Sequence, residues 1–269
     1  METRYHGFLL SDYQVREILS AEKENAICAK CEGLPCKKNQ NPNYQSVIQV
    51  SGQQILLATK KCKYAQSAFR QREVDEKLRL AKIPARYKGK TFEDYQVDND
   101  NADAVAKAKK YLKNPQNGLL FYGKPGRGKS LLAAIISQEM LKKGKSVIFR
   151  DVPSLLENLQ QSYDNKNNGT INEKMEALTK VDLLVLDDVG TEKPTEWAIT
   201  RLYLIINERY NANKPMIVTS NYSGVELAKR LNNPVGAKSE GVTGNRIVSR
   251  LSEMCEVATL GGRDRRIGK

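Results

Sequence analysis

Long hydrophobic runs are missing from this sequence of 269 residues, and no apolar stretch approaches the ~20 residues that a membrane-spanning helix needs. The first residues, METRYHGFLLSDYQ, carry acidic side chains early and contain no small-residue cleavage site, so we expect no secretory signal. Histidine and tryptophan occur once each, as His6 and Trp197. The missing targeting features predict a cytoplasmic protein that makes no contact with a membrane.

Acidic residues are scarce relative to basic ones, with 31 Asp and Glu against 44 Lys and Arg and a formal net charge of +13. A pI near 9.4 favours a polyanionic partner, of which nucleic acid is the simplest. A lysine-rich solvated surface would give the same charge, so composition alone does not decide between the two. The length predicts one large domain and a smaller one.

Cysteine is rare outside one short segment, which holds four of the five cysteines of the chain. In a cytosolic protein such clustering favours metal binding over disulfides. The four are Cys28, Cys31, Cys36 and Cys62, with the spacing C-x2-C-x4-C-x25-C. Residues 45–50 and 54–58 predict two strands turned at Ser51-Gly52, and such a hairpin between cysteine pairs is typical of a zinc ribbon with a structural Zn²⁺. His6 is an alternative ligand, and reduced cysteines without metal are the other interpretation.

Two helices are predicted around this cysteine segment. Residues 12–25 show an amphipathic pattern, and residues 63–82 are charged without a strong apolar face, as is typical of a connector. We therefore expect a zinc-binding domain at 1–75, a linker at 76–90 and a larger domain at 91–269.

Strand and helix patterns alternate through the rest of the chain, which predicts an α/β fold with a doubly wound parallel sheet. The strands are expected at 118–122, 146–150, 182–187, 215–220 and 256–260. The helices are expected at 101–112, 129–142, 153–163, 171–179, 195–211, 223–231 and 243–253.

A glycine loop between the first of these strands and the next helix matches the phosphate-binding pattern G-x-x-x-x-G-K-[ST] at every fixed position. Glycines let backbone N–H groups turn inward around a phosphate chain, and the helix N-terminus adds partial positive charge. Lys129 is expected to reach the β- and γ-phosphates, and the Ser130 hydroxyl to ligate Mg²⁺. The loop and its continuation comprise Gly123, Lys124, Pro125, Gly126, Arg127, Gly128, Lys129, Ser130 and Leu131. A basic, glycine-rich surface loop is the alternative interpretation.

Two later strands end in polar residues. Asp187 and Asp188 close the apolar run LLVL, and Asn221 follows the run MIVTS. Unpaired carboxylates are costly at the end of a buried strand, and this end faces the ligand crevice of an α/β sheet, so the pair predicts a Mg²⁺–phosphate site. Asp187 is expected to hold Mg²⁺, Asp188 to orient and deprotonate a water, and Asn221 to contact that water or the γ-phosphate. The alternatives are an exposed Asp-Asp turn and a Ser-Asn turn or helix cap.

Three arginines, one threonine and one tryptophan complete the candidates. Arg246 and Arg250 share one face of the last predicted helix, where a solvated surface is the ordinary interpretation. Arg266 closes a further arginine cluster, GRDRR, for which a nucleotide contact in the same chain and a basic tail are the two interpretations. Trp197 follows Thr195 at the start of a predicted helix, and stacking on a nucleic-acid base and burial in the core are its two interpretations.

Taken in order, GKPGRGKS, LLVLDDVGTE, VTSN, NRIVSRL and GRDRR resemble the AAA+ ATPases, and among them the DnaC/DnaI-type bacterial helicase loaders. Residues 83–95, IPARYKGKTFEDY, are similar to that family's lead-in to the ATPase core, which packs near the adenine. The resemblance extends over residues 83–269. More loosely, the cysteine segment resembles the zinc-binding, helicase-contacting domain of the DnaI branch.

The resemblance implies an AAA+ ATPase with ATP, Mg²⁺ and Zn²⁺ as cofactors. It implies that the protein binds a replicative hexameric helicase, self-associates through its ATPase domains and delivers the helicase onto single-stranded DNA. The implied roles are Lys129 and Ser130 in the phosphate loop, Asp187 and Asp188 as the acidic pair, Asn221 as sensor 1, Arg250 as the first and Arg246 as the second candidate arginine finger, Arg266 as the sensor 2 arginine, and Thr195 and Trp197 as DNA contacts.

The sequence departs from this family at two positions. Asp188 stands where a glutamate is usual, which predicts slow intrinsic hydrolysis, and Arg127 occupies a loop position often held by a small residue. The IstB-type transposition helper ATPases share the same core, and the cysteine segment favours the loader over them. A nucleic-acid-binding protein that uses ATP only structurally and a small-molecule P-loop kinase are more distant alternatives.

Overall fold

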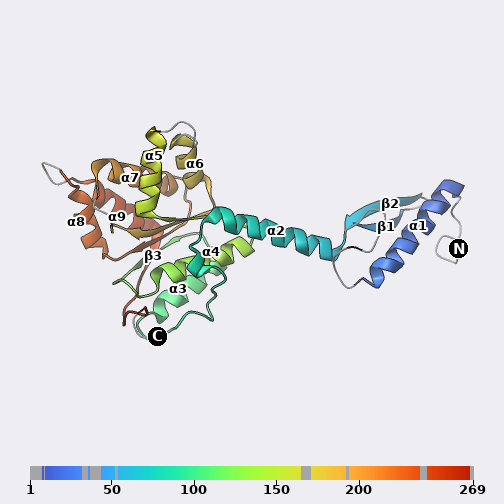
Figure 1. Cartoon of the computed structure of the whole chain (residues 1–269), viewed down its shortest axis with the longest axis horizontal. Coiled ribbons are helices and arrows are strands. Elements are labelled where there is room, and N and C mark those ends of the chain that lie inside the picture. Colours follow the sequence, from blue (N-terminus) through green and yellow to red (C-terminus); the bar gives the residue numbers. More distant parts are fainter. Residues whose placement is uncertain are drawn as a thin grey trace. The chain divides into compact units, whose positions relative to one another are not determined.

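The computed structural model describes residues 8, 10–31, 36, 44–51, 54–164, 171–191, 194–236 and 241–266. The chain divides into two compact units, Met1–Asp75 and Glu76–Lys269. The boundary falls inside helix α2 (Lys63–Ala81), which Figure 1 labels together with other elements of both units. None of the helices within these described stretches is long and apolar enough to span a lipid bilayer.

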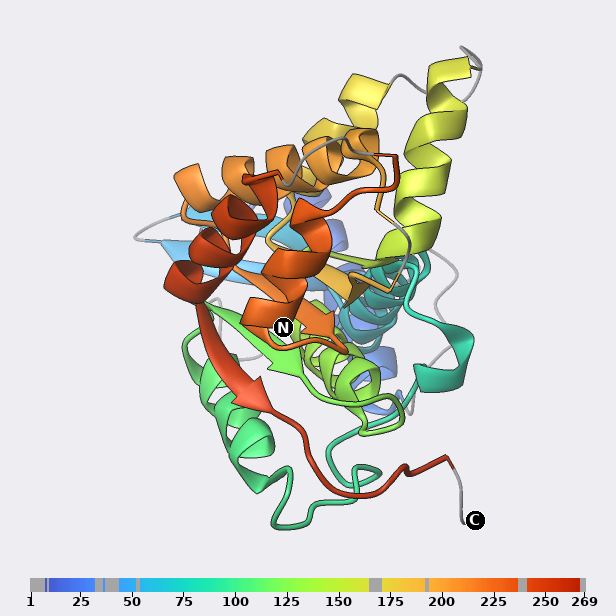
Figure 2. The same cartoon turned by 90° about the vertical axis from the view of Figure 1, so that its left-hand side faces the viewer.

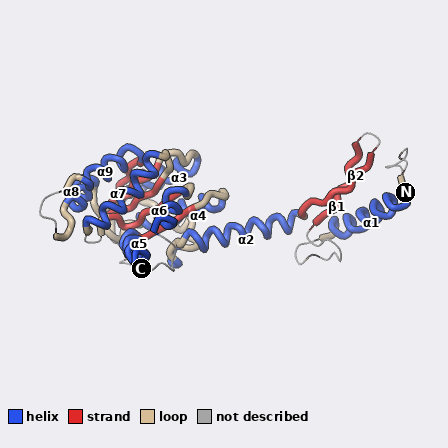
Figure 3. Tube along the Cα trace, turned by 90° about the horizontal axis from the view of Figure 1, so that it is seen from above, coloured by secondary structure: helices blue, strands red, loops and turns tan. Residues whose placement is uncertain are grey.

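The first unit consists of helix α1 (Asp12–Ala29), strands β1 (Tyr44–Ser51) and β2 (Gln54–Lys61), and the beginning of α2. Helix α1 begins at a capping box in which the Ser11 hydroxyl accepts from the Gln14 N–H and the Gln14 side chain accepts from the Ser11 N–H. The helix lies along β1 (Figure 3) and buries Ile18 and Ala21. The predicted helix and antiparallel hairpin are therefore present, while Gly52 of the predicted turn lies outside the described residues.

The second unit is built on a five-stranded parallel sheet with the strand order β4-β5-β6-β3-β7. The strands are β3 (Gly118–Tyr122), β4 (Val147–Asp151), β5 (Leu183–Val189), β6 (Met216–Ser220) and β7 (Cys255–Thr259). Each strand overlaps the stretch in which the sequence predicts one, so the predicted α/β fold with a parallel sheet is confirmed.

Helices cover both faces of this sheet, as Figures 1 and 2 show: α3 and α4 lie on one face, and α5 to α9 lie on the other. Their bounds are α3 (Ala102–Lys113), α4 (Lys129–Lys142), α5 (Val152–Asp164), α6 (Ile171–Lys180), α7 (Glu196–Asn211), α8 (Gly224–Asn232) and α9 (Thr243–Met254). This arrangement confirms the prediction that the sheet is doubly wound.

Alternating side chains of the strands supply two separate cores. In β3, Leu119 and Phe121 pack with α3 and α4, whereas Leu120 between them packs with the helices of the opposite face. Leu184 and Leu186 of β5 join the second core in the same way. Strands with both faces covered are apolar at almost every position, which explains the continuous hydrophobic runs in the sequence.

The stretch for which a linker is expected, residues 76–90, belongs to the second unit. Ala81 and Ile83 are buried in the core on the α3–α4 face, and a short 3-10 helix, η1 (Ala85–Tyr87), follows them. The charged pattern that favours a connector thus ends in residues whose side chains pack in the core of the second unit, and the linker bounds stay a prediction.

The order of the strands determines where a ligand site lies. After β3 the chain crosses to β4 at the far edge of the sheet, whereas the last strand, β7, is added on the other side of β3. A crevice opens at the carboxyl ends of parallel strands where the winding direction changes in this way. The loop after β3 stands at that point.

Candidate nucleotide-binding site

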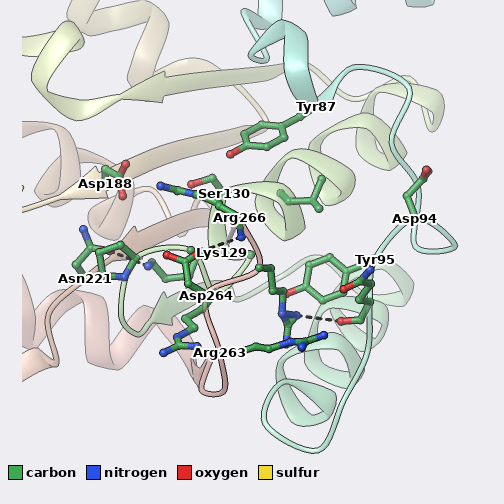
Figure 4. A pocket seen from close by; sticks show the side chains of 17 residues that line it. Tyr87, Asp94, Tyr95, Lys129, Ser130, Asp188, Asn221, Arg263, Asp264 and Arg266 are labelled. Atoms are coloured by element: carbon green, nitrogen blue, oxygen red, sulfur yellow. Dashed lines mark hydrogen bonds between the residues drawn. The ribbon is translucent and has the colours of Figure 1, made fainter. Parts of the chain in front are cut away.

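A cavity of about 370 Å³ lies beside the loop that follows β3, and Figure 4 shows side chains that line it. Its lining is drawn from separate parts of the chain: Tyr87 with 94–96, the loop at 125–131, the strand-end residues Asp188 and Asn221, and the tail at 263–266. Gly123, Lys124 and Asp187 of the predicted set stand outside this lining. The phosphate loop, the ends of β5 and β6, the lead-in and the arginine-rich tail thus converge on one place.

At two glycines of the loop, a side chain is excluded by a steric clash or by the backbone conformation. Gly128 is the N-cap of α4 with φ 91°, and a Cβ there would lie 2.7 Å from the hydroxyl oxygen of Tyr95. A Cβ on Gly123 would lie 2.1 Å from the carbonyl oxygen of Leu260. Only glycine lets the loop turn tightly between the tail and the lead-in while the helix N-terminus faces the cavity.

Lys129, the first residue of α4, is 95 % buried, with 5 % of its surface exposed. Its ammonium group donates to the carbonyl oxygens of Gly123 (2.7 Å) and Lys124 (3.1 Å) and to Oδ1 of Asn221 (2.7 Å). Burial lowers the pKa of this ammonium, and the nearby charges of Asp188 and Asp187 oppose that shift. The three neutral acceptors hold the cation in the loop, where phosphate oxygens would be stronger partners.

Asp187 is buried near the end of β5, and Thr219 of the neighbouring strand donates a 2.6 Å hydrogen bond to its Oδ1. Burial raises the pKa of this carboxyl to about 6; the hydrogen bond from Thr219 lowers it, the charge of Asp188 raises it further, and a hydrogen bond from Ser130 lowers it. The two predicted Mg²⁺ ligands, Ser130 and Asp187, therefore lie in contact. A hydroxyl and a carboxylate are oxygen donors that suit Mg²⁺, and a cation would offset the desolvation of the buried acid.

Asp188 is half-buried and faces the cavity, unlike its neighbour Asp187. Its φ of 58° lies in the left-handed region, and its N–H donates to the hydroxyl oxygen of Thr219 over 2.9 Å. An aspartate so placed, with Lys129 and Asn221 in the same lining, is suited to orient a water next to a phosphate. Thr219 does not stand out in the sequence, because a threonine in an apolar strand has no pattern that sets it apart.

The tail after β7 runs over the phosphate loop. The Leu260 N–H donates to the Tyr122 carbonyl (2.8 Å) and the Arg265 N–H donates to the Gly126 carbonyl (3.0 Å), so the tail is tied to the strand and to the loop. Arg265 is anchored by a 2.5 Å ion pair with Asp98. Arg266 lines the cavity, and its charge lowers the pKa of Lys129, as expected for a cation near the phosphates.

The tail also brings an acid that sequence reasoning did not single out. Asp264 lies against the phosphate loop, so close that a Cβ on Gly126 would meet its Oδ1 at 1.9 Å. The only signal was its place inside the GRDRR cluster, where the surrounding arginines dominate the pattern. Residues 94–96 and Tyr87, from the lead-in that the resemblance places near an adenine, line the same cavity.

Arg246 and Arg250 on α9 stand outside the cavity of their own chain. Arg246 is exposed. The Nε of Arg250 donates to Oδ1 of Asn207 over 2.9 Å, and its guanidinium stands 5.0 Å from the ring centre of Tyr203 and 5.5 Å from that of Tyr210. The structure therefore does not bring either arginine to the nucleotide site of the same chain.

Thr195 and Trp197 lie at the start of α7. The Thr195 hydroxyl accepts from the Ala198 N–H over 3.2 Å and so caps the helix. Trp197 is half-buried against the core of the α5–α9 face, and the guanidinium of Arg201 stands 5.7 Å from its ring centre. These contacts give both residues structural roles in the second unit.

The four clustered cysteines line a cavity of about 450 Å³ in the first unit, between the end of α1, residue 36 and the end of the hairpin. Among the residues that the structure describes, however, no group of three or more His, Cys, Asp or Glu side chains is arranged to hold a metal ion. His6, the alternative ligand, falls outside the described residues. The predicted zinc site is therefore not formed by the described side chains.

A model of the family described as "IstB-like ATP binding protein" matches residues 55–267. The replicative helicase loader DnaI of Bacillus subtilis is 24% identical over 257 residues, which cover 93% of this chain and 81% of DnaI. The replicative helicase loader DnaC of Escherichia coli is 31% identical over 146 residues, but the match covers 52% of this chain and only 59% of the length of DnaC. Among solved structures, a crystal structure of DnaI matches with a TM-score of 0.57 and 27% identity, covering 69% of this chain and 95% of the chain in that crystal structure.

Proposed function

This chain belongs to the family of IstB-like ATP-binding proteins and is homologous to the DnaC and DnaI helicase loaders, and on that premise we propose that it is an ATPase that loads a replicative DNA helicase onto single-stranded DNA when replication begins. The observation that carries the loader role is the extent of the DnaI match. A match over 93% of the chain covers most of the first unit, of which the family model covers only the part from residue 55 onward. The first unit is thus part of what this chain shares with a loader.

The residues of the cavity have complementary parts in this reaction. The loop N–H groups and Lys129 bind the phosphates, while Ser130 and Asp187 would hold Mg²⁺, which neutralises charge on the phosphate oxygens when bound. Asp188 orients a water and takes its proton as the oxygen adds to the γ-phosphorus and the bond to the bridging oxygen of ADP breaks. Asn221 holds the γ-phosphate or the water, and Arg266 adds positive charge from the tail.

Each unit has its own partner in this proposal. The first unit binds the helicase, and Zn²⁺ bound by the four cysteines would stabilise the fold of this unit. The proposal of zinc is supported by the four thiols, which line one cavity. The second units associate side by side in the cytoplasm, each offering Arg250 or Arg246 to the nucleotide of its neighbour, and hold single-stranded DNA with the help of Thr195 and Trp197.

A second candidate function is that of an IstB-type transposition helper, because the family model that matches residues 55–267 carries that name. Its partner would be a transposase in place of a helicase. The two functions share the ATPase core, so hydrolysis does not separate them, and the partner does.

Native mass spectrometry of this protein mixed with the replicative helicase of its host, with and without ATP, tests the proposal. A defined complex is expected, and its mass also counts the zinc ions per loader chain. Asp188→Ala is expected to bind ATP and to lose hydrolysis. If no complex with the helicase forms in either condition while a transposase is bound, the loader function is wrong and the helper function replaces it.

A further inference from the structure

Strand β5 departs from regular geometry just where the two acids stand. Asp188 has a φ of 58°, and the pairing of β5 with β6 shifts register between Leu186 and Val189. A residue other than glycine in the left-handed region is strained, and an irregularity of this kind re-aims a side chain. Here it turns Asp188 into the cavity, while Val189 returns to the core of the α5–α9 face.

One buried hydroxyl contacts both acids at this irregularity. The Oγ1 of Thr219 in β6 accepts from the Asp188 N–H at 2.9 Å and donates to Oδ1 of Asp187 at 2.6 Å. Thr219 is fully buried. A hydroxyl has one proton to donate. Thr219 donates it to the Asp187 carboxylate and accepts the Asp188 N–H with a lone pair of its oxygen.

We propose that Thr219 is a positioning residue for ATP hydrolysis, which holds the carboxylate of Asp187 and the strained backbone of Asp188 in one fixed arrangement. The inference rests on the proposed ATPase function and names a residue of that same site. Thr219 is not among the residues that line the cavity. It acts through the two acids, one beside the Mg²⁺ position and the other beside the attacking water.

The contacts of Thr219 are expected to affect the rate of hydrolysis and not the affinity for nucleotide. In the described part of the chain, the side-chain hydrogen bonds of Thr219 go to the two acids and not to the phosphate loop. Lys129 and the loop carbonyls have their own contacts, which do not include Thr219. Loss of the hydroxyl is therefore expected to leave phosphate binding in place and to disturb the step that needs both acids.

Ser220, the next residue of β6, offers a matched control. Its hydroxyl is also fully buried and also bridges to β5, donating to the Val189 carbonyl over 2.8 Å. It contacts neither acid by a side-chain hydrogen bond in the described part of the structure. Ser220→Ala thus removes a comparable strand-to-strand bond without touching Asp187 or Asp188.

The test uses the full chain in single-turnover ATP hydrolysis with protein in excess, which separates the rate at saturation from the half-saturating concentration. Thr219→Val is expected to lower the saturated rate about 10- to 100-fold, as loss of an outer partner of a metal ligand does. The half-saturating concentration stays near that of the parent protein, Thr219→Ser recovers most of the rate, and Ser220→Ala keeps it. Thr219→Ala replaces the valine variant if that variant does not fold.

Two results overturn the inference. One is a folded Thr219→Val or Thr219→Ala protein that hydrolyses ATP at the parent rate; the other is Ser220→Ala losing as much rate as the Thr219 variants, which would mean a general weakening of the sheet. A parent protein that hydrolyses no ATP in the same assay overturns the proposed ATPase function instead, so the two failures are distinguishable.

Discussion

The ammonium group of Lys129 donates a 2.7 Å hydrogen bond to the side-chain oxygen of Asn221, which follows it by 92 residues in the chain. The contact joins the N-terminus of α4 to the residue just after β6, so the phosphate loop is linked directly to the end of the strand that neighbours β3. The ammonium otherwise reaches only carbonyl oxygens of the loop in the described structure. A γ-phosphate would attract it more strongly than these neutral acceptors do.

Lys129→Ala is expected to weaken ATP binding about 10- to 100-fold, because hydrogen bonds to charged groups contribute about 1.5–3 kcal/mol each. Titration calorimetry with a non-hydrolysable ATP analogue measures the change. Lys142→Ala at the other end of α4 is the control, since Lys142 pairs with Glu139 on the surface. Equal affinities of the two variants would contradict the assignment of Lys129 to the phosphates.

The burial of Asp187 makes the stability of the second unit depend on pH. Burial raises the pKa of this carboxyl from 3.8 to about 6, so between these values the unfolded chain loses a proton that the folded chain keeps. Stability therefore falls as the pH rises from about 4 to 6, and above 6 the ionised acid costs about 3 kcal/mol. Asp187→Asn is expected to regain that amount at about pH 8 and to gain little at about pH 4.

Urea unfolding in the absence of nucleotide and Mg²⁺ measures this difference. The fluorescence of Trp197 reports on the second unit alone, because it is the chain's single tryptophan and lies in that unit. Asp103→Asn is the control, since Asp103 pairs with Lys107 on the surface. A gain from Asp187→Asn that is the same at both pH values would show that it does not come from ionisation.

Arg209 of α7 is fully buried, and its guanidinium donates to carbonyl oxygens at the end of α6 and before β5 and β6. Arg209→Met leaves these acceptors without a donor, so the free energy of unfolding is expected to fall by about 3 kcal/mol or more. Lys229→Met on the exposed face of α8 is expected to change it by less than about 0.5 kcal/mol. Trp197 fluorescence in urea measures both, and equal stabilities of the two variants would contradict the structural role.

The spacing of apolar residues and the polar residues between apolar runs were enough to predict the strands and helices of the second unit. Nearly every strand is apolar on both faces, and each is bounded by polar residues. Asp188 and Asn221 are brought to one cavity with the phosphate loop for the same reason: parallel strands end at one edge of the sheet.

Properties that depend on tertiary contacts were not predictable from local patterns. Arg209 has the sequence context of a solvated helix charge, yet it is fully buried among carbonyl groups. Thr219 has the context of an ordinary β-branched residue, yet it holds two acids. The spacing of the four cysteines predicted a zinc site, but spacing does not determine whether the sulfur atoms converge, and the described side chains form no such group.

Zinc removal checks the first unit directly. If Zn²⁺ binds the four cysteines, the purified chain is expected to contain one zinc ion, and a strong chelator is expected to lower the melting temperature of the first unit, because metal binding and folding are coupled. Cys62→Ser should lower the zinc content, whereas Cys255→Ser, in the core of the second unit, should not. Metal analysis and circular dichroism make the comparison, and a full-length protein without zinc would contradict the ligand set.

Arg250 is held by Asn207 and two tyrosines outside its own cavity, as an arginine that serves a neighbouring chain would be. Arg250→Ala is therefore expected to bind ATP normally and to lose hydrolysis roughly 10³-fold, the effect of removing an arginine finger. Mixing the Arg250→Ala protein with the Lys129→Ala protein should restore part of the rate. The Arg250→Ala chain binds ATP, and the neighbouring Lys129→Ala chain still provides Arg250 to that nucleotide. Arg246→Ala, tested alongside, decides between the two candidate fingers. A mixture that stays inactive, while each variant still assembles with the parent protein, would mean that Arg250 acts only on the packing of α7 and α9.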